Sequence, residues 1–292
     1  MSYVRIIALT SLAMIAFAGN SLLCRIALKD TSIDAASFTA IRLISGALML
    51  WLVVRMSRAT HTGRGNWLSA FALFVYAAGF SFAYVSLPAA SGALLLFGAV
   101  QATMIGYGIW RGERLLRLQL VGIMFAFGGL VGLMLPGLSA PPLYGSILML
   151  AAGVAWGVYS LRGKGAGDPT KVTAGNFLRA APIAAVLSVL MFHGTSLDHA
   201  GFWYAVSSGA LASGIGYAVW YTALPALKAA TAATVQLSVP VIAALGGIVL
   251  LGEPITLRLV LASVAILGGI ALVILEKQQT SGVQLTASTD RS

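Results

Sequence analysis

Charge is what this sequence has least of. Only 9% of its 292 residues are Asp, Glu, Lys or Arg, whereas 59% are hydrophobic and the mean hydropathy is +0.93. A soluble domain carries roughly 25% charged residues, so this chain has too few charges to cover a water-facing surface. The apolar residues form long runs, such as 6–23 and 241–251, and the charges lie mostly between the runs. This pattern is typical of a protein that crosses a membrane many times.

Other absences exclude whole classes of function. The single Cys24 allows no internal disulfide. The net charge of +10 forms no continuous basic patch, so we expect no nucleic-acid partner. The glycine-rich segment 163–167 lacks the Walker spacing, and no HExxH or nucleophile-elbow motif is present. The spacing of His193, Asp198 and His199 matches no standard metal site. We therefore expect no enzyme activity, no cofactor and no metal.

Ten apolar segments are each long enough to cross the roughly 30 Å hydrocarbon core as a helix. The first begins near Arg5 like a signal peptide, but its length predicts an uncleaved spanning helix. The polar tail 277–292 is predicted to be disordered. The predicted segments are 4–28, 35–55, 67–87, 89–110, 116–135, 142–162, 172–193, 200–221, 227–251 and 255–275.

The distribution of Lys and Arg predicts the orientation. With the amino terminus inside, 13 of these residues fall on the inner side, and only Arg25, Lys29 and Arg258 fall outside. Cytoplasmic loops carry such an excess, so we expect a multi-pass inner (plasma) membrane protein with both termini in the cytoplasm.

The sequence also resembles itself at a nearly constant offset. Arg42 and Arg179 correspond at an offset of 137, as do segments 84–89 and 221–226; the Gly-Glu pairs 112–113 and 252–253 correspond at 140. These matches predict two five-helix repeats, 1–139 and 140–276. Because five is odd, the second repeat enters the membrane from the opposite side, which is a transporter signature.

With these features, residues 4–275 resemble the drug/metabolite transporter superfamily. Within that superfamily they resemble the EamA-type proteins, and most closely the YddG-type amino-acid exporters. The resemblance implies a basket of ten helices around a central cavity. The first, third, fourth, sixth, eighth and ninth helices would line the cavity, the second and seventh would flank it, and the fifth and tenth would be peripheral. It also implies efflux of amino acids, notably aromatic ones, and of toxic analogues.

Two arginines, Arg42 and Arg179, are the charges that lie deep within predicted spans, about seven or eight residues from where each span begins. Each either binds a substrate carboxylate or is a structural charge that snorkels or pairs with a glutamate on its own side of the membrane. The second interpretation, which we favour, pairs Arg42 with Glu253 and Arg179 with Glu113. Both glutamates are predicted to cap the starts of the fifth and tenth helices. No acid lies in the middle of a span, so we expect no buried carboxylate relay.

Aromatic and amide side chains in the predicted lining helices are the candidates for substrate binding. Rings can stack on an apolar solute or its ammonium group, and amides can bind its polar groups. Lipid contact and helix packing are the alternatives for each ring. The candidates are Phe17, Asn20, Ser21, Phe80, Tyr84, Gln101, Trp156, Tyr159, Tyr217, Trp220, Tyr221 and Gln236.

The sequence thus predicts an all-α secondary transporter that exports amino acids and related metabolites by alternating access. The alternative substrates are sugar phosphates or nucleotide sugars, which would require several central cations, whereas only Arg42 and Arg179 lie deep within predicted spans. The expected partners are the substrate and the lipid bilayer, and a monomer is the default expectation.

Overall fold

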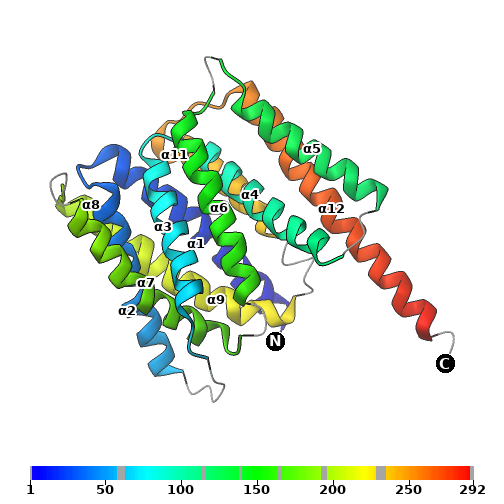
Figure 1. The fold of residues 1–292 in the computed structure, drawn as a ribbon, viewed down its shortest axis with the longest axis horizontal. Helices are drawn as coiled ribbons and strands as arrows, with labels where there is room; N and C mark the ends of the chain where they lie inside the picture. The colour runs from blue at the N-terminus through cyan, green and yellow to red at the C-terminus, as the bar shows by residue number, and fades with distance from the viewer. Residues whose placement is uncertain are drawn as a thin grey trace.

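The computed structural model describes residues 2–57, 63–112, 116–137, 140–163, 166–191, 196–227 and 235–289, with side chains to residue 274. All regular structure within these ranges is helical (Figure 1). The elements are α1 (Tyr3–Asp30), α2 (Ala35–Met56), α3 (Trp67–Tyr84), α4 (Ala89–Trp110), α5 (Arg117–Met134), α6 (Leu143–Gly163), α7 (Pro169–Leu190), α8 (His199–Ser207), η2 (Ser208–Ile215), α9 (Gly216–Ala223), η3 (Leu224–Ala226), α11 (Ser238–Leu251) and α12 (Leu257–Thr289).

The predicted all-α membrane fold is confirmed. Eight of these helices are long and apolar enough to cross a bilayer: α1 to α7, and α12 over Leu257–Ile274. The predicted segment 200–221 is divided among α8, the π-helical η2 and α9. The segment predicted at 227–251 contains the shorter apolar helix α11, and part of it lies outside the described residues.

Polar side chains fix where several helices begin. Asp34 accepts hydrogen bonds from the backbone N–H groups of Ala36 and Ser37 at the start of α2. Asn66 and Asp168 cap α3 and α7 in the same way. Because Asp168 precedes Pro169, and proline suits the first helical position, α7 begins three residues before the predicted 172.

Asp34 also joins two segments that are distant in the sequence. Its carboxylate accepts a hydrogen bond from the Ser196 N–H, and its own N–H donates to the Ser196 carbonyl. Although burial acts to raise it, hydrogen bonds from Ser37, Ser196 and Ala36 hold the pKa of Asp34 below its ordinary value. This carboxylate therefore stays ionised at neutral pH and holds α2 beside the segment that leads into α8.

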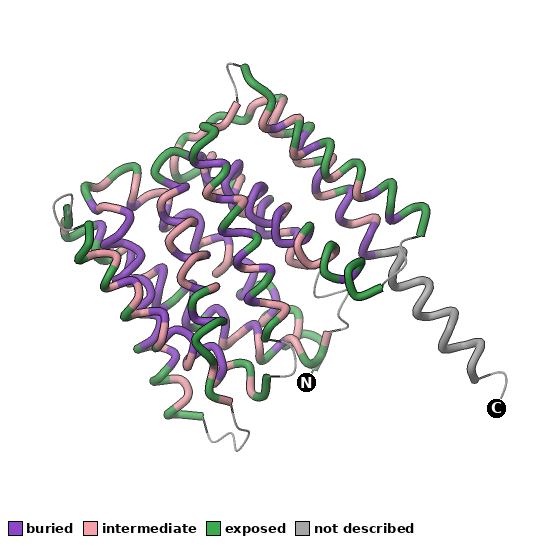
Figure 2. Tube along the Cα trace, viewed as in Figure 1, coloured by how far each residue is buried: buried purple, intermediate pink, exposed green. Residues whose placement is uncertain are grey.

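The spans form one packed bundle with a separate pair at its side. Helices α3 and α6, α2 and α7, and α4 and α6 pack closely, whereas α5 and α12 pack mainly on each other (Figure 1). The outer faces of this pair are exposed (Figure 2). In a membrane protein such apolar faces contact lipid. The peripheral position expected for the fifth and tenth spans agrees with this arrangement.

The bundle has two ends, which are named here by their residues. At the α6–α7 end, Arg162 near the end of α6 donates to Ser69 and Asn66 at the start of α3. At the α3–α4 end, Gly145 near the start of α6 packs against Ser86 and Leu87. Helices α3 and α6 are therefore antiparallel, and their ends mark the two faces of the membrane domain.

In the carboxy-terminal segment, helix α12 continues beyond its apolar part to Thr289. The disorder expected for the tail 277–292 stays a prediction. Extending an existing helix costs far less than starting one. The backbone of the polar residues that follow the apolar run therefore continues the helix.

A candidate substrate cavity

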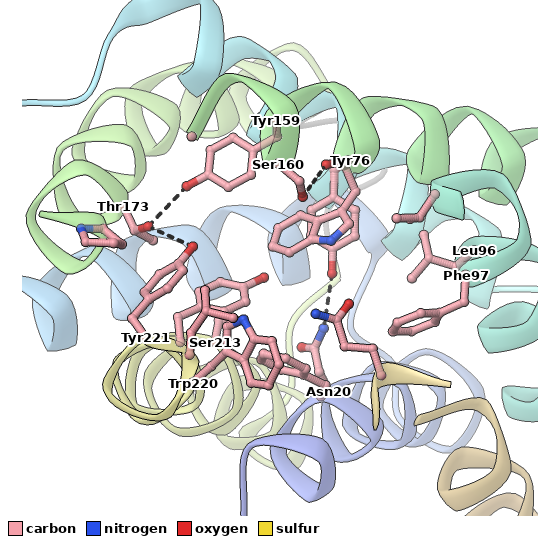
Figure 3. A pocket seen from close by; sticks show the side chains of 18 of the residues that line it. Asn20, Tyr76, Leu96, Phe97, Tyr159, Ser160, Thr173, Ser213, Trp220 and Tyr221 are labelled. Carbon is pink, nitrogen blue, oxygen red and sulfur yellow. Dashed lines mark hydrogen bonds between the residues drawn. The ribbon is translucent and has the colours of Figure 1, made fainter. Parts of the chain in front are cut away.

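A cavity of about 550 Å³ lies at the centre of the bundle (Figure 3). Ligand sites typically enclose about 300–1,000 Å³, so this volume suits a small metabolite. Its walls come from α1, α3, α4, α6, α7, η2, α9 and the chain before α11. The seventh span, expected only to flank the cavity, contributes Val172, Thr173 and Asn176 to its wall.

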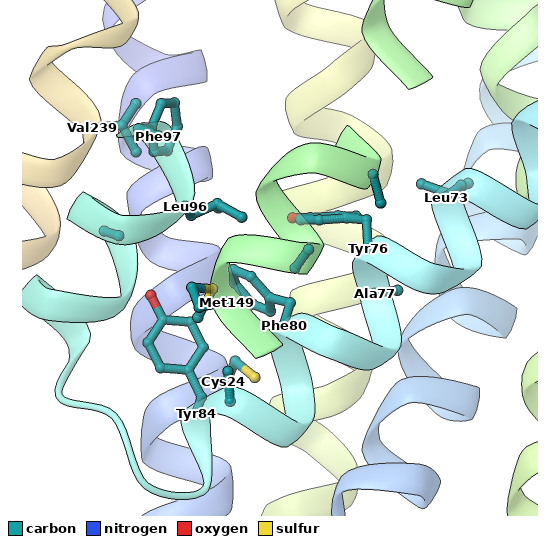
Figure 4. Packing of buried hydrophobic residues seen from close by; sticks show 14 of the residues in the cluster. Cys24, Leu73, Tyr76, Ala77, Phe80, Tyr84, Leu96, Phe97, Met149 and Val239 are labelled. Carbon is teal, nitrogen blue, oxygen red and sulfur yellow. The ribbon is translucent and has the colours of Figure 1, made fainter. Parts of the chain in front are cut away.

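The cavity opens at the α6–α7 end. Its lining there includes Gly163, Gly167 and Pro169, all of which are exposed. At the opposite end, Phe80 is 1% exposed and the next turn of α3 brings Tyr84, which is fully buried. Figure 4 shows Phe80 and Tyr84 packed with Cys24 and Met149. The cavity is thus accessible from one face and closed from the other.

Aromatic rings in contact form much of the wall. The Trp156 ring stacks on Tyr217 at 5.4 Å and on Tyr159 at 5.3 Å between ring centroids. Tyr76 approaches Trp156 to 4.7 Å, and Phe17 approaches Tyr217 to 5.5 Å. Such a wall offers π-faces to an apolar or aromatic solute and to its ammonium group.

The described part of the lining carries no formal charge. Among the described residues that form it, none is Asp, Glu, Lys, Arg or His. Polar groups come instead from amides and hydroxyls, including Gln101 and Gln236. The described lining therefore offers a ligand neutral hydrogen bonds and ring contacts.

One polar cluster joins α1, α2, α3 and η2. The Asn20 amide donates to the Tyr76 hydroxyl at 3.5 Å (Figure 3), and the Ser208 hydroxyl donates to the Asn20 amide oxygen at 2.6 Å. From behind the cavity wall, Arg42 donates through Nη2 to the same Tyr76 hydroxyl at 3.1 Å. A buried arginine is thereby connected to the cavity surface.

A second cluster lies nearer the opening. The Tyr159 hydroxyl donates to Thr173 at 3.4 Å, and the Thr173 hydroxyl donates to Tyr221 at 3.3 Å (Figure 3). The Asn176 amide donates to Tyr159 at 3.4 Å and accepts from the Asn66 N–H at 2.9 Å. This cluster connects the cavity wall to the start of α3.

The structure places eleven of the twelve candidate side chains in one lining. They are Phe17, Asn20, Ser21, Phe80, Gln101, Trp156, Tyr159, Tyr217, Trp220, Tyr221 and Gln236. The twelfth, Tyr84, lies outside it. Its ring packs against Gly92 and its hydroxyl donates to the Ala89 carbonyl at 3.3 Å. Tyr84 therefore belongs to the closed α3–α4 end.

The expected pair of Arg42 and Glu253 does not form, which corrects that interpretation. Glu253 pairs instead with Arg25, at 3.1 Å between Oε1 and Nε. Arg42 is 2% exposed, and its guanidinium lies over Phe80 and Tyr76 at 4.8 and 5.3 Å from the ring centroids. The side chain of Arg42 extends from α2 toward Tyr76 of α3. Arg25 lies near the end of α1, close to Glu253, and takes the place expected for Arg42.

Glu253 also caps a helix other than the one expected. Its Oε2 accepts a hydrogen bond from the Ala89 N–H, the first residue of α4, at 2.7 Å. The start of α12 is capped instead by Thr256, whose hydroxyl accepts from the Leu259 N–H. The segment before α12 folds toward α4, so the carboxylate meets the positive end of that neighbour. Glu113, its counterpart in the first repeat, lies outside the described residues.

Arg179 is near the α6–α7 end and is held by backbone. Its Nη1 donates to the carbonyls of Arg64 and Gly175 at 2.7 and 2.8 Å, and its guanidinium is 6.0 Å from the Trp67 ring centroid. Its expected partner Glu113 is outside the described residues. Arg179 is not among the residues that line the cavity.

Sequence reasoning missed several lining residues, including Tyr76, Thr173 and Asn176. Tyr76 lies one helical turn before Phe80, so the i, i+4 spacing would have identified it. No comparable signal marks Thr173 and Asn176, because α7 was not expected to line the cavity.

The eighth span contains an irregularity that the sequence did not reveal. Residues Ser208–Ile215 are π-helical and interrupt what would otherwise be one α-helix. Ala212 and Ser213 from this segment line the cavity, and Tyr217 and Trp220 follow in α9. A π segment shifts the register of the side chains that follow it. It thus sets which face of α9 points at the cavity.

Comparison with known proteins gives a family. Residues 143–275 match the model of the EamA-like transporter family. An uncharacterized protein of Pseudomonas aeruginosa is 62% identical over 272 residues, covering 92% of this chain and 94% of its own length. An uncharacterized transporter of Archaeoglobus fulgidus is 32% identical over 167 residues, covering 56% of this chain and 59% of its own.

The fold has a match among solved structures. A crystal structure of a protein that is 19% identical superposes with a TM-score of 0.66, covering 94% of this chain and 98% of that chain. At this identity the match concerns the fold alone. Residues 143–275 thus match the EamA-like transporter family, and together with the spans and the cavity these similarities support a membrane transporter rather than an enzyme.

Proposed function

We propose that this transporter exports amino acids, including aromatic ones, and related metabolites or toxic analogues. The observation that carries the proposal is the cavity of about 550 Å³, whose described lining is aromatic, rich in amides and hydroxyls, and without a charged residue. Its rings suit apolar and aromatic side chains, and its amides and hydroxyls suit an amino acid's polar groups.

The direction follows from the predicted orientation. In an inner membrane with both termini in the cytoplasm, the α6–α7 end faces the cytoplasm. The opening at Gly163, Gly167 and Pro169 would then load substrate from inside, as an exporter requires. Release outside would follow when the two proposed inverted repeats, 1–139 and 140–276, exchange conformations and the α3–α4 end opens.

Sugar phosphates and nucleotide sugars fit the cavity less well. A phosphate ester is bound by Arg and Lys side chains, often in bidentate contacts. Among the described lining residues there is no cation, so a doubly charged substrate would lose its hydration without a direct countercharge.

The test is uptake of labelled Phe, Tyr, Trp, Met, Thr and Lys into proteoliposomes, beside a sugar phosphate, with and without a pH gradient. We expect saturable uptake of amino acids that does not depend on the gradient, because no carboxylate or histidine is found in the described lining. Uptake of the sugar phosphate alone would refute the proposal.

A matched pair of tryptophan variants connects that uptake to the cavity. Trp156→Ala removes the ring that stacks on Tyr217 and Tyr159, and we expect the apparent KM for phenylalanine to rise by roughly tenfold. Trp203→Ala removes a 53% exposed ring of α8 that lies outside the cavity. Uptake should be unchanged in this control.

A further inference from the structure

Arg42 is a buried cation with unused hydrogen-bonding capacity. Its side chain is among the largest that are fully buried, and its Nε and Nη1 have no hydrogen-bond partner among the described residues. The contacts with the Tyr76 and Phe80 rings compensate only part of the cost of burying a charge. Arg42 does not line the cavity. Its charge can therefore act on a bound ligand only through a residue that contacts both Arg42 and the ligand.

The Tyr76 hydroxyl supplies that connection. Its oxygen accepts from Arg42 and from Asn20, which occupies both lone pairs of a phenol oxygen. Its own hydrogen has no acceptor among the described residues. Because Tyr76 lines the cavity, this hydrogen is free to donate to a ligand, and a donor that itself accepts from a cation is a stronger donor.

Neighbouring groups in the lining have donors to spare. The Asn20 amide has a second N–H beyond the one that it gives to Tyr76. The Ser213 hydroxyl is 1% exposed, lines the cavity and has no partner among the described residues. Hydrogen-bond donors that have no acceptor in the protein favour a ligand group that only accepts hydrogen bonds, such as a carboxylate.

We propose that Tyr76 and Asn20 form a carboxylate subsite in the cavity, with Arg42 behind Tyr76 as its countercharge. The ligand carboxylate accepts hydrogen bonds from the Tyr76 hydroxyl and the Asn20 amide. Arg42 is a positioning residue: it touches Tyr76, not the ligand. This inference rests on the proposed transport of amino acids and specifies which group of the substrate is recognised.

The same geometry assigns a lesser role to the substrate's ammonium group. No carboxylate is present in the described lining to pair with it, so it meets rings such as Trp156 and neutral oxygen atoms such as those of the Gln101 and Gln236 amides. Cation–π contacts are weaker than charge-assisted hydrogen bonds supported by a buried cation. The preferred ligand class is therefore an aromatic or apolar monocarboxylate, in which the amino group adds little.

The experiment measures the thermal stability of the purified full-length protein while it is titrated with four compounds. They are phenylalanine, 3-phenylpropionate, phenylalaninamide and 2-phenylethylamine. A ligand that binds the folded state raises the transition temperature according to its Kd. We expect the two carboxylates to bind with Kd values within about tenfold of each other, and the two amines at least about tenfold more weakly.

Variants separate this selectivity from folding. Tyr76→Phe keeps the ring and removes the hydroxyl, and Arg42→Gln removes the charge. In both, the Kd ratio of 2-phenylethylamine to 3-phenylpropionate should fall toward one, whereas Arg42→Lys should retain part of the preference. Tyr204→Phe is the matched control, because Tyr204 lies on α8 outside the lining, and it should keep the full ratio.

Each outcome has a distinct meaning. If the wild-type protein binds the amines as tightly as the carboxylates, or if Tyr76→Phe keeps the preference, the carboxylate subsite is refuted while amino-acid transport still stands. If none of the four compounds stabilises the protein, the proposed amino-acid function fails, and the subsite fails with it.

Discussion

At the scale of single residues, Glu253 connects three elements at the closed end. Its carboxylate pairs with Arg25 of α1 and accepts from the first N–H of α4. Arg25 also donates to the carbonyls of Tyr84 and Val85 at the end of α3. The Arg25 and Glu253 side chains are only 12% and 8% exposed, so solvent screens this contact weakly. This network stabilises the contacts among the helices at the closed α3–α4 end of the bundle.

We therefore predict that Glu253→Gln destabilises the protein by about 2–4 kcal/mol. The substitution leaves Arg25 without its countercharge, and removing one partner of a buried pair is costly. The measurement is the thermal transition of the detergent-purified protein. Asp30→Asn is the matched control, because Asp30 is an exposed acid at the same end of α1, and it should change the transition little. Equal transitions for the two variants would contradict a structural role for Glu253.

At the scale of elements, the π-helical η2 is packed backbone to backbone against α2. A Cβ added at Gly209 would collide with the Arg42 carbonyl and the Ser45 hydroxyl. The absence of a side chain at Gly209 thus allows the backbone of η2 to contact the turn of α2 that contains Arg42. Gly128 on α5, by contrast, has no such neighbour within 4 Å.

These two glycines give opposite predictions for the same substitution. Gly209→Ala should lower the free energy of unfolding by roughly 1–3 kcal/mol, because the backbone of α2 must move away. Gly128→Ala should be neutral or stabilising by up to about 1 kcal/mol, because alanine favours a helix interior. Thermal transitions measured in the same detergent test both, and a Gly209→Ala variant as stable as the wild type would show that the contact is loose.

At the scale of the whole molecule, the cavity is open at one end and sealed at the other. Tyr221 lines the open part, whereas Tyr84, its counterpart at the offset of 137 in the proposed repeat, is buried in the closed end. Under alternating access these two tyrosines would exchange environments. The present arrangement would then be one of the two states of the proposed transport cycle.

Cysteine labelling tests which end is open. In a Cys24→Ala background, Ser160→Cys places a thiol in the cavity wall, whereas Ser81→Cys places one in the fully buried packing of α3. We expect a small maleimide to label the first rapidly and the second slowly. Adding Glu253→Gln should speed labelling of the second, since it removes the Arg25 contact that fastens the α3–α4 end. Similar rates for both thiols without that change would contradict a closed end.

The long apolar runs and the scarcity of charge were sufficient to predict an all-helical membrane protein, because a chain in lipid must satisfy its backbone within each segment. The resemblance to EamA-type proteins implied which helices line the cavity, and the aromatic and amide residues of those helices supplied eleven of its lining residues, including Asn20, Gln101 and Trp156. The type of residue at each position of an apolar run is a local signal, which the sequence contains completely.

Contacts between distant segments were decided by the tertiary structure alone. Sequence could not show that Glu253 meets Arg25 and α4 rather than Arg42 and α12, because several oppositely charged residues were available and only packing chooses among them. The same holds for the connection of Arg42 with Tyr76, the π segment that orients α9, and the inclusion of α7 in the cavity wall. Each depends on where two helices lie in space, which no pattern within one helix specifies.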